Sequence, residues 1–432
     1  MDPVSNIPEE THHGFRTRLA SYARSLLPAE PFSTGFWIFF TAAFFFDFAI
    51  GLYFFLFNLF LANLHFNERI IGLITGALTL GNVAGTIPVS MLVKRFGLQR
   101  VLLLCFSVAP PIFALRTLLL STQAQLGLAF LAGVTLCCWP VCFSPVAAKL
   151  TTENNRVSAF SILFATGIGT GILAGLVGGY LPALIRTTGT ASNLANSMRP
   201  VLLLACGVAM LGIWPTLKLH LGPVEITETA RHRLIHPVLL RFLPAFAFWS
   251  LVTGSFTPFA AIFLQQHLKM PLKDVGLIFS GSQLTQVFAV LLAPILYRQF
   301  GTIAGIMCTQ FATGIAVFAL GQSQSVSMVV VCYLGYNGAQ YMSGPGFYSM
   351  LMTRLPESER SKGSAVQNIV GALSQAGAAA LTGSLLVRYG YSTVLSGNAV
   401  AAVAAAFLLF VLLGSTNRQR VTSSEPAKAE VL

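Results

Sequence analysis

The stretch PVSMLVKRFG (Pro88–Gly97) recurs in altered form as PILYRQFG (Pro294–Gly301), and the two Phe-Gly pairs lie 204 residues apart. Two further correspondences have nearly the same offset: Lys149-Leu150 with Arg354-Leu355 at 205 residues, and RVSA (156–159) with KGSA (362–365) at 206. Independent matches at one offset predict a chain built from two similar halves.

The composition indicates that most of the chain is embedded in a lipid membrane. Only 9% of its 432 residues are charged, 55% are hydrophobic, and the mean hydropathy is +0.73. A soluble globular protein has about 25% charged residues. The composition therefore excludes an ordinary soluble enzyme, a disordered regulator and a nucleic-acid-binding protein.

Apolar stretches of about 20 residues recur between short polar breaks, which is the spacing of membrane-spanning helices. They are continuously apolar rather than alternating, so a transmembrane barrel is excluded. The expected fold class is an all-α membrane protein with twelve helices in two six-helix bundles. The spans are predicted at residues 36–61, 70–93, 101–121, 126–148, 157–184, 200–217, 238–265, 275–297, 302–321, 326–353, 364–387 and 392–414.

Lysine and arginine are unevenly distributed between the two sides of this arrangement. With the N-terminus inside, 19 of the 26 fall in inner loops and tails, six fall outside, and Arg116 lies within a span. The positive-inside rule therefore places both termini in the cytoplasm. This bias explains the net charge of +12 without nucleic acid, and it indicates a multi-pass protein of the plasma (inner) membrane.

The same topology divides the chain into five parts. They are a cytoplasmic tail with an amphipathic helix (1–32), an N-terminal bundle (33–220), a cytoplasmic linker (221–237), a C-terminal bundle (238–414) and a second tail (415–432). The sequence has no phosphate-binding loop, zinc-ligand cluster or nucleophile constellation, so we expect no cofactor, no metal site and no enzyme. All seven cysteines fall within spans, which favours packing over disulfides.

The turn after the second span reads Ser90-Met-Leu-Val-Lys-Arg-Phe-Gly-Leu-Gln-Arg100. Together with the repeat and the span count, it resembles the major facilitator superfamily over about residues 33–414. The family's signature is Gly, three residues, Asp, Arg, any residue, Gly and then basic residues, and here Ser90 replaces the first Gly and Lys94 the Asp. The resemblance implies a conformational loop motif made of Lys94, Arg95, Gly97, Arg100, Arg298 and Gly301.

The resemblance also implies a secondary transporter whose halves rock around a substrate site at the midplane. The fifth span has no Gly-Pro pair of the family's antiporter signature, and the fourth lacks the Arg of many proton-coupled exporters. Antiport is therefore not indicated. Prolines within spans, such as Pro258 and Pro345, favour kinks that would assist such motion.

Two charged residues lie well inside predicted spans. Asp47 follows Phe36 by eleven residues, so it lies about 16 Å into a hydrocarbon core about 30 Å thick. A carboxylate at that depth is a functional candidate, as a proton carrier or as the partner of a cationic substrate, and a structural hydrogen-bonded role is the alternative. Arg116 lies about 22 Å along the third span, where outward snorkelling, a structural contact and a functional role all stay open.

Polar and aromatic side chains in both halves predict a cavity at the midplane, because amides cost free energy in lipid unless they are paired. This cavity is almost without charge and lacks a cationic clamp for phosphates, di-acids or nitrate, which favours a neutral or weakly cationic organic solute. The predicted substrate-binding residues are Asp47, Asn58, Thr79, Asn82, Trp139, Trp249, Gln283, Gln286, Asn337, Gln340, Tyr341, Gln367 and Gln375.

The expected function is secondary active transport of such a solute by alternating access, with protons coupled through Asp47. Two alternatives stay open. One is a flippase for lipids or amphiphiles, suggested by the 35 phenylalanines, and the other is a membrane protein that senses a ligand without moving it. The expected partners are a small-molecule substrate, protons and the lipid bilayer, and the expected assembly is a monomer.

Overall fold

The computed structural model describes residues 31–189, 193–221, 237–323 and 325–414. The predicted amphipathic helix, most of the linker and the second tail lie outside these residues. Within them the regular structure is helical. The first half contains α2 (Thr34–Asn63), α3 (Glu68–Phe96), α4 (Leu98–Leu118), α5 (Thr122–Leu136), α6 (Cys138–Lys149), α7 (Arg156–Thr187), α8 (Leu194–Met210) and α9 (Ile213–Leu217).

The second half begins with an interrupted helix. Its pieces are α10 (Pro237–Phe256), the 3-10 turn η1 (Thr257–Phe259), α11 (Ala260–Ile262) and the π-helical turn η2 (Phe263–His267). There follow α12 (Leu272–Phe300), α13 (Thr302–Gln322), α14 (Val326–Arg354) and α15 (Glu357–Leu413), which Gly390 divides into two segments.

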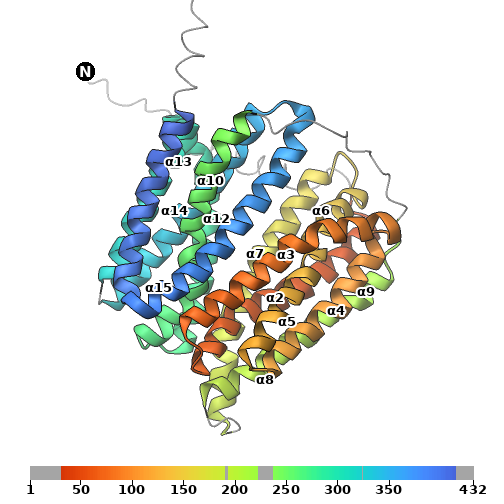
Figure 1. Ribbon diagram of the computed structural model, residues 1–432. Helices are drawn as coiled ribbons and strands as arrows, with labels where there is room; N and C mark the ends of the chain where they lie inside the picture. The colour runs from red at the N-terminus through yellow and green to blue at the C-terminus, as the bar shows by residue number, and fades with distance from the viewer. Residues whose placement is uncertain (1–30, 190–192, 222–236, 324, 415–432) are drawn as a thin grey trace, which may run out of the picture.

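Among the described residues, ten helical stretches have the length and composition to cross a membrane, and the last of them, Lys362–Leu413, contains both segments of α15. α14 has 29 residues and a more polar sequence, and it completes the set. The predicted all-α fold of twelve spans in two halves is therefore confirmed. Figure 1 shows the first half, coloured red to yellow-green, beside the second half, coloured green to blue.

The sequence repeat has an exact structural counterpart at the two Phe-Gly turns. α3 and α12 each have 29 residues, and each ends at a glycine with positive φ: Gly97 at φ 84° and Gly301 at φ 80°. α4 and α13, which follow them, each have 21 residues. Because a side chain is strained at such φ values, glycine is required at both turns.

The two halves meet through small residues far from these turns. A Cβ on Gly72 would overlap the carbonyl oxygen of Ala379, so α3 and α15 are in backbone contact there. α7 and α12 approach in the same way at Gly175 and Gly276. Small residues allow this kind of close helix approach in membranes.

We call this region the closed end, defined by Asn63, Glu68, Gln265 and Tyr391. The Asn63 amide donates to Gln265 Oε1 at 3.1 Å, and the Tyr391 hydroxyl donates to Glu68 Oε1 at 3.3 Å, so hydrogen bonds also join the halves here. One hydrophobic core runs through both halves at this level, from Leu52 to Ala399.

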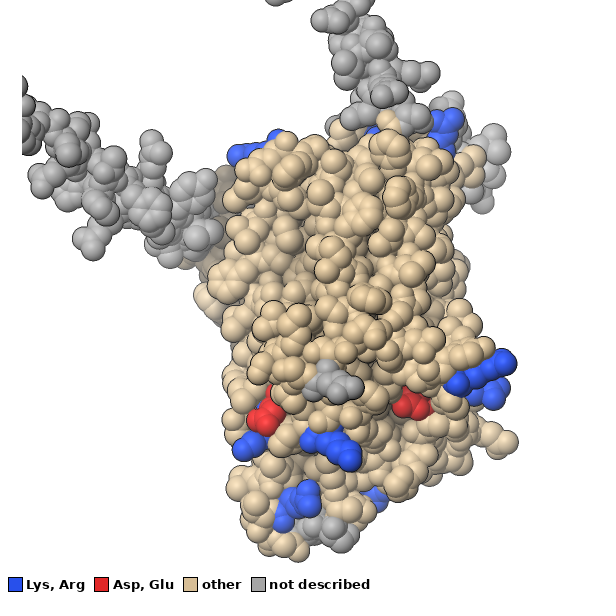
Figure 2. Space-filling model, turned by 90° about the vertical axis from the view of Figure 1, so that its left-hand side faces the viewer, with Lys and Arg blue, Asp and Glu red and all other residues tan. Residues whose placement is uncertain are grey.

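The other end, which we call the basic end, carries Lys94, Arg95, Arg100 and Arg298. Each half has a core of its own there: one from Phe36 to Leu219 and the other from Leu239 to Leu413. The halves therefore share a core at the closed end and have separate cores at the basic end. On the face seen in Figure 2, charged side chains gather near the two ends and leave a broad uncharged band between them, as a membrane protein requires.

Candidate functional site

A cavity of about 360 Å³ lies between the halves, and residues of the shared core such as Phe55, Phe57 and Tyr333 form part of its lining. It is lined by α2, α3 and α4 from the first half and by η1, α11, α12 and α14 from the second. Its walls include three phenylalanines of α2 (Phe54, Phe55 and Phe57) and Phe279 of α12. A concave, mostly aromatic pocket with a few polar groups is the usual form of a small-molecule site.

The break in the first helix of the second half contributes backbone polarity to this cavity. Pro258 has no N–H and interrupts the helix as a 3-10 turn at Thr257–Phe259. The Asn58 amide donates to the Pro258 carbonyl oxygen at 3.0 Å, which ties α2 to the second half. Irregular backbone in a membrane protein is tolerated where it lines a cavity, and transporter sites are often built at such broken helices.

Five predicted substrate-binding residues line the cavity: Asn58, Gln283, Gln286, Asn337 and Tyr341. They come from three helices, and both halves contribute. Asn337 is 8% exposed, and its amide also donates to the Tyr333 carbonyl oxygen at 2.9 Å. The structure thus brings these residues together, while their role in binding stays a prediction.

Arg116 also lines the cavity, which the sequence-based description of a chargeless cavity did not include. Its side chain is only 2% exposed, and its guanidinium lies 4.3 Å from the ring centroid of Phe57 and 5.7 Å from that of Phe113. Outward snorkelling is therefore wrong for this residue, because the cation is buried among aromatic rings. The expectation of a cavity without a cationic side chain is wrong for the same reason, and with it falls the argument for a neutral or weakly cationic solute.

The surroundings of Arg116 leave its donors unused. Its side chain donates no hydrogen bond to any described residue, and Nε is fully buried without a partner. The nearby Tyr53 hydroxyl is engaged elsewhere, since it donates to the Phe113 carbonyl oxygen at 2.8 Å. The signal that marks this residue was present in the sequence: an ionisable side chain within a span is a functional candidate by default.

Asp47 lies outside the set of cavity-lining residues. It follows the start of α2 by thirteen residues and precedes Phe54 by seven, so it lies about 10 Å along the helix toward the basic end from the cavity. Its neighbours are Trp139 of α6, which interacts with the carboxylate, and Gly167 of α7, whose Cβ position is 3.9 Å from Asp47 Oδ2. One turn along α7, Gly171 packs against the amide of Gln283, so Asp47 lies next to the contact between the halves.

The remaining predicted residues are not among those that line the cavity. Trp249 is 3% exposed, and its indole donates to the Ser343 hydroxyl at 2.8 Å, which gives it a packing position inside the second half. Gln367 is fully buried with both amide atoms unpartnered, and Gln375 packs against Gly254. Thr79, Asn82, Trp139 and Gln340 lie on helices that border the cavity or Asp47, but they do not line the cavity.

The predicted loop motif lies at the basic end. Lys94 and Arg95 are exposed in the last turn of α3, Arg100 is exposed in the first turn of α4, and Arg298 is exposed in the last turn of α12. Gln99, between Gly97 and Arg100, donates to the Thr216 carbonyl oxygen at 3.1 Å and so ties α4 to α9. A conformational role for the six motif residues stays a prediction.

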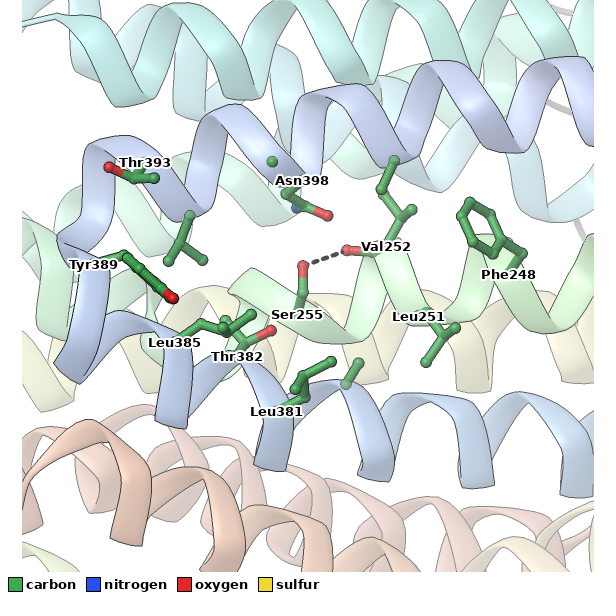
Figure 3. Close-up of a pocket in the computed structure, with 14 residues that line it drawn as sticks. Phe248, Leu251, Val252, Ser255, Leu381, Thr382, Leu385, Tyr389, Thr393 and Asn398 are labelled. Atoms are coloured by element: carbon green, nitrogen blue, oxygen red, sulfur yellow. Dashed lines mark hydrogen bonds between the residues drawn. The ribbon is translucent and has the colours of Figure 1, made fainter.

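A separate groove of about 390 Å³ lies between α10 and the two segments of α15. Figure 3 shows Ser255, Thr382 and Asn398 around its space, among apolar side chains such as Leu251 and Leu381. The groove shares no lining residue with the cavity between the halves. It therefore supplies no lateral opening into that cavity of the kind a flippase would need.

Comparison with known proteins identifies the architecture. The sequence model described as Major Facilitator Superfamily matches residues 39–255 and, a second time, residues 239–431. The structure of the nucleoside transporter NupG is similar, with a TM-score of 0.73 and 14% identity over 88% of this chain and 99% of that one.

Two further structures have the same fold. A bacterial homologue of the human lysosomal transporter Spinster, inward-facing and occupied, has a TM-score of 0.71 and 14% identity over 91% of this chain and 98% of that one. A D-xylose-proton symporter has a TM-score of 0.67 and 16% identity over 86% and 95%. No curated protein sequence matches the chain.

Proposed function

The chain belongs to the major facilitator superfamily, and from that premise we propose that it is a secondary transporter that moves a small organic solute by alternating access. The cavity of about 360 Å³ between the halves carries this proposal. The shared core closes it toward Asn63 and Gln265, while the halves have separate cores toward Lys94 and Arg298. With the basic end in the cytoplasm, as the positive-inside rule predicts, this arrangement corresponds to an inward-facing monomer of the plasma (inner) membrane with both termini inside.

The test needs no knowledge of the solute, because it measures from which side the cavity can be reached. Tyr341 lines the cavity and is 46% exposed, so a Tyr341→Cys variant in a Cys308→Ser background presents one accessible thiol there. In proteoliposomes, a membrane-impermeant maleimide should label this cysteine from either side, since the cavity opens alternately. Val317→Cys, whose side chain is fully buried, is the control and should be labelled from neither side.

A cross-link then relates access to the movement of the halves. Asn63 and Gln265 are hydrogen-bonded across the closed end, so an Asn63→Cys/Gln265→Cys pair should form a disulfide that holds this end shut. Labelling of Tyr341→Cys from the closed-end side should then disappear and return on reduction, while labelling from the basic end persists. Labelling from one side only, with or without the disulfide, would instead indicate a ligand sensor that does not move its halves.

The proposal extends to coupling through Asp47. Its carboxylate lies next to the contact between α7 and α12, where rocking of the halves would change its surroundings. Uptake of the solute into proteoliposomes under an imposed pH gradient should therefore exceed its uptake without a gradient. The Asp47→Asn variant should lose this difference but should still exchange solute across the membrane without a gradient. Asp274→Asn, in the first turn of α12 at the membrane edge, is the control and should keep the gradient dependence.

A further inference from the structure

Arg116 is the charged side chain among the residues that line the cavity. We propose that the transported solute is a small organic monoanion, with a carboxylate as its simplest form, and that its negative group pairs with Arg116. This inference rests on the proposed transport function and names the chemical class of its substrate. The inference follows from three properties of Arg116: its side chain is buried, its guanidinium N–H groups donate no hydrogen bond to a described residue, and it has no ion-pair partner among those residues.

No described side chain compensates the positive charge of Arg116. A buried cation costs free energy unless an opposite charge and hydrogen bonds accompany it. The acid nearest to the middle of the membrane is Asp47, which lies ten residues from Phe57 on α2 and so about 15 Å along the helix from the ring under the guanidinium. Glu68, at the closed end, accepts a hydrogen bond from Tyr391. Within the described part of the chain, Arg116 has no ion pair, so the compensating charge has to come from a ligand.

Two aromatic rings hold the guanidinium of Arg116 in position. Phe57 and Phe113 support it from α2 and α4, and a guanidinium stacked on aromatic rings keeps its N–H edge free for a planar acceptor. The Gln125 amide donates to the carbonyl oxygen of Arg116 itself at 2.5 Å, which fixes the end of α4. The side chain is therefore positioned by its neighbours without being neutralised by them, as a site for a carboxylate requires.

The position equivalent to Arg116 in the second half holds an uncharged residue. α4 and α13 have the same length and follow equivalent glycine turns, so the position 204 residues after Arg116 is Leu320. Leu320 is fully buried in the shared core. The fold thus accepts an aliphatic side chain at this position, and the arginine in the first half needs an explanation other than packing.

The rest of the cavity narrows the class of solute. One cation balances one negative charge, and the lining has no carboxylate to receive a positive group, which disfavours zwitterions and organic cations. Gln283 and Gln286 make no hydrogen bond to a described residue, so their amides remain for a second polar group. Phe54, Phe55 and Phe279 offer an apolar wall, and the expected solute is therefore a monocarboxylate with an apolar or aromatic body.

The experiment compares carboxylates with their uncharged isosteres. Thermal unfolding of the purified protein is measured with benzoate against benzamide, phenylacetate against phenylacetamide, and hexanoate against hexanamide, since a bound ligand raises the unfolding temperature. The carboxylates should stabilise the wild-type protein more than the amides. Arg116→Leu should weaken carboxylate binding by about 10- to 100-fold, the loss expected for hydrogen bonds to a charged group.

Two variants and a ligand-free measurement distinguish a binding role from a structural one. Without ligand, Arg116→Leu should unfold at a higher temperature than the wild type, because it removes an uncompensated buried charge. Arg116→Lys should keep a weaker preference for carboxylates, since it retains the charge but not the planar pair of donors. Arg388→Leu, an exposed cation over Tyr389 near the closed end, is the control and should change neither quantity.

The outcomes separate this inference from the transport proposal. The anion site would be overturned if amides and carboxylates stabilised the protein equally. It would also be overturned if ligand-free Arg116→Leu unfolded at a lower temperature than the wild type. If carboxylates bind through Arg116 but the cavity opens to one side only in the labelling experiment, transport is wrong and the anion site stands. If the cavity alternates and only uncharged solutes bind, transport stands and the anion site is wrong.

Discussion

Gly133 of α5 and Asn337 of α14 lie 204 residues apart, at the same level of the fourth helix in each half. In the first half, a Cβ on Gly133 would overlap the Leu78 carbonyl oxygen, so α3 and α5 touch through their backbones. In the second half, Asn337 lines the cavity, while Thr285, the counterpart of Gly81, packs against the neighbouring Gly338. The repeat has kept the helix ends and turns, while the sides of the helices have diverged.

The two halves also differ in their charged and polar residues. Asp47 and Arg116, the two charged candidates from the predicted spans, both belong to the first half, and Arg116 lies in the last turn of α4. The second half contributes amides to the cavity, at Gln283, Gln286 and Asn337. If the first half binds the ionic groups and the second half the polar ones, exchanging a residue for its counterpart should have very different effects in the two halves.

The largest expected effect of such an exchange is on folding. Gly133→Asn places a side chain against the backbone of Leu78 and Asn82, and rigid backbone cannot yield as a side chain would. We expect a loss of stability of about 3 kcal/mol or more, at the upper end of overpacking effects, measured by chemical or thermal unfolding in detergent. Gly127→Asn is the control, since nothing lies within 4 Å of its Cβ position. Similar stability of the two variants would contradict the close contact of α3 and α5.

A second expectation concerns the two charges of the first half together. If Arg116 carries a monoanion and Asp47 a proton, one transport step moves no net charge, so uptake responds to a pH gradient and not to membrane potential. In Asp47→Asn, each step would move one negative charge, and 100 mV, worth about 2.3 kcal/mol per charge, should change carboxylate accumulation by about 50-fold. The measurement uses a radiolabelled carboxylate from the thermal series, in proteoliposomes with a potassium diffusion potential. A wild-type protein that responds to potential would contradict this pairing of roles.

The sequence predicts the framework well, for identifiable reasons. Continuous apolar runs determine the number of spans, and glycine is required at Gly97 and Gly301, where a φ near 80° is combined with an extended ψ. The two turns therefore mark the repeat in the sequence as clearly as in the structure. Amides such as Gln283 and Asn337 reach the cavity as expected, whereas Gln367 is buried elsewhere with both amide atoms unpartnered.

The sequence predicts the rotation of the helices much less well. α4 is apolar on all sides, so nothing in its pattern tells whether Arg116 faces lipid, core or cavity. The depth of Asp47 in the membrane could be predicted from the sequence, but the level of the cavity could not. That level depends on where the halves meet, at contacts such as that of Gly175 with Gly276, which lie far apart in the chain. Trp249 shows the same limit, since its hydrogen bond to Ser343 is a tertiary contact between residues 94 apart.

The two equivalent turns offer a comparison in which the halves should respond alike. Gly97→Ala and Gly301→Ala each force a side chain into a backbone region that only glycine occupies readily, at an expected cost of about 1–3 kcal/mol. Both variants should lose similar stability, because φ and ψ at the two glycines differ by only a few degrees. Gly207→Ala is the control: its φ is ordinary and its Cβ position is open. A loss confined to one turn would show that the two turns are not equivalent.

The smallest expected effect separates the two tryptophans. Trp249→Phe removes a donor to Ser343, whose hydroxyl still donates to the Gln340 carbonyl oxygen, so the cost should be about 1 kcal/mol, with gradient-driven uptake unchanged. Trp139 occupies the position of Ser343 in the first half, and it touches Asp47 instead of another neutral residue. Trp139→Phe should therefore alter the pH dependence of uptake at a similar cost in stability. If both variants changed stability alone, the carboxylate would be a structural group, and the functional asymmetry of the halves would reduce to Arg116.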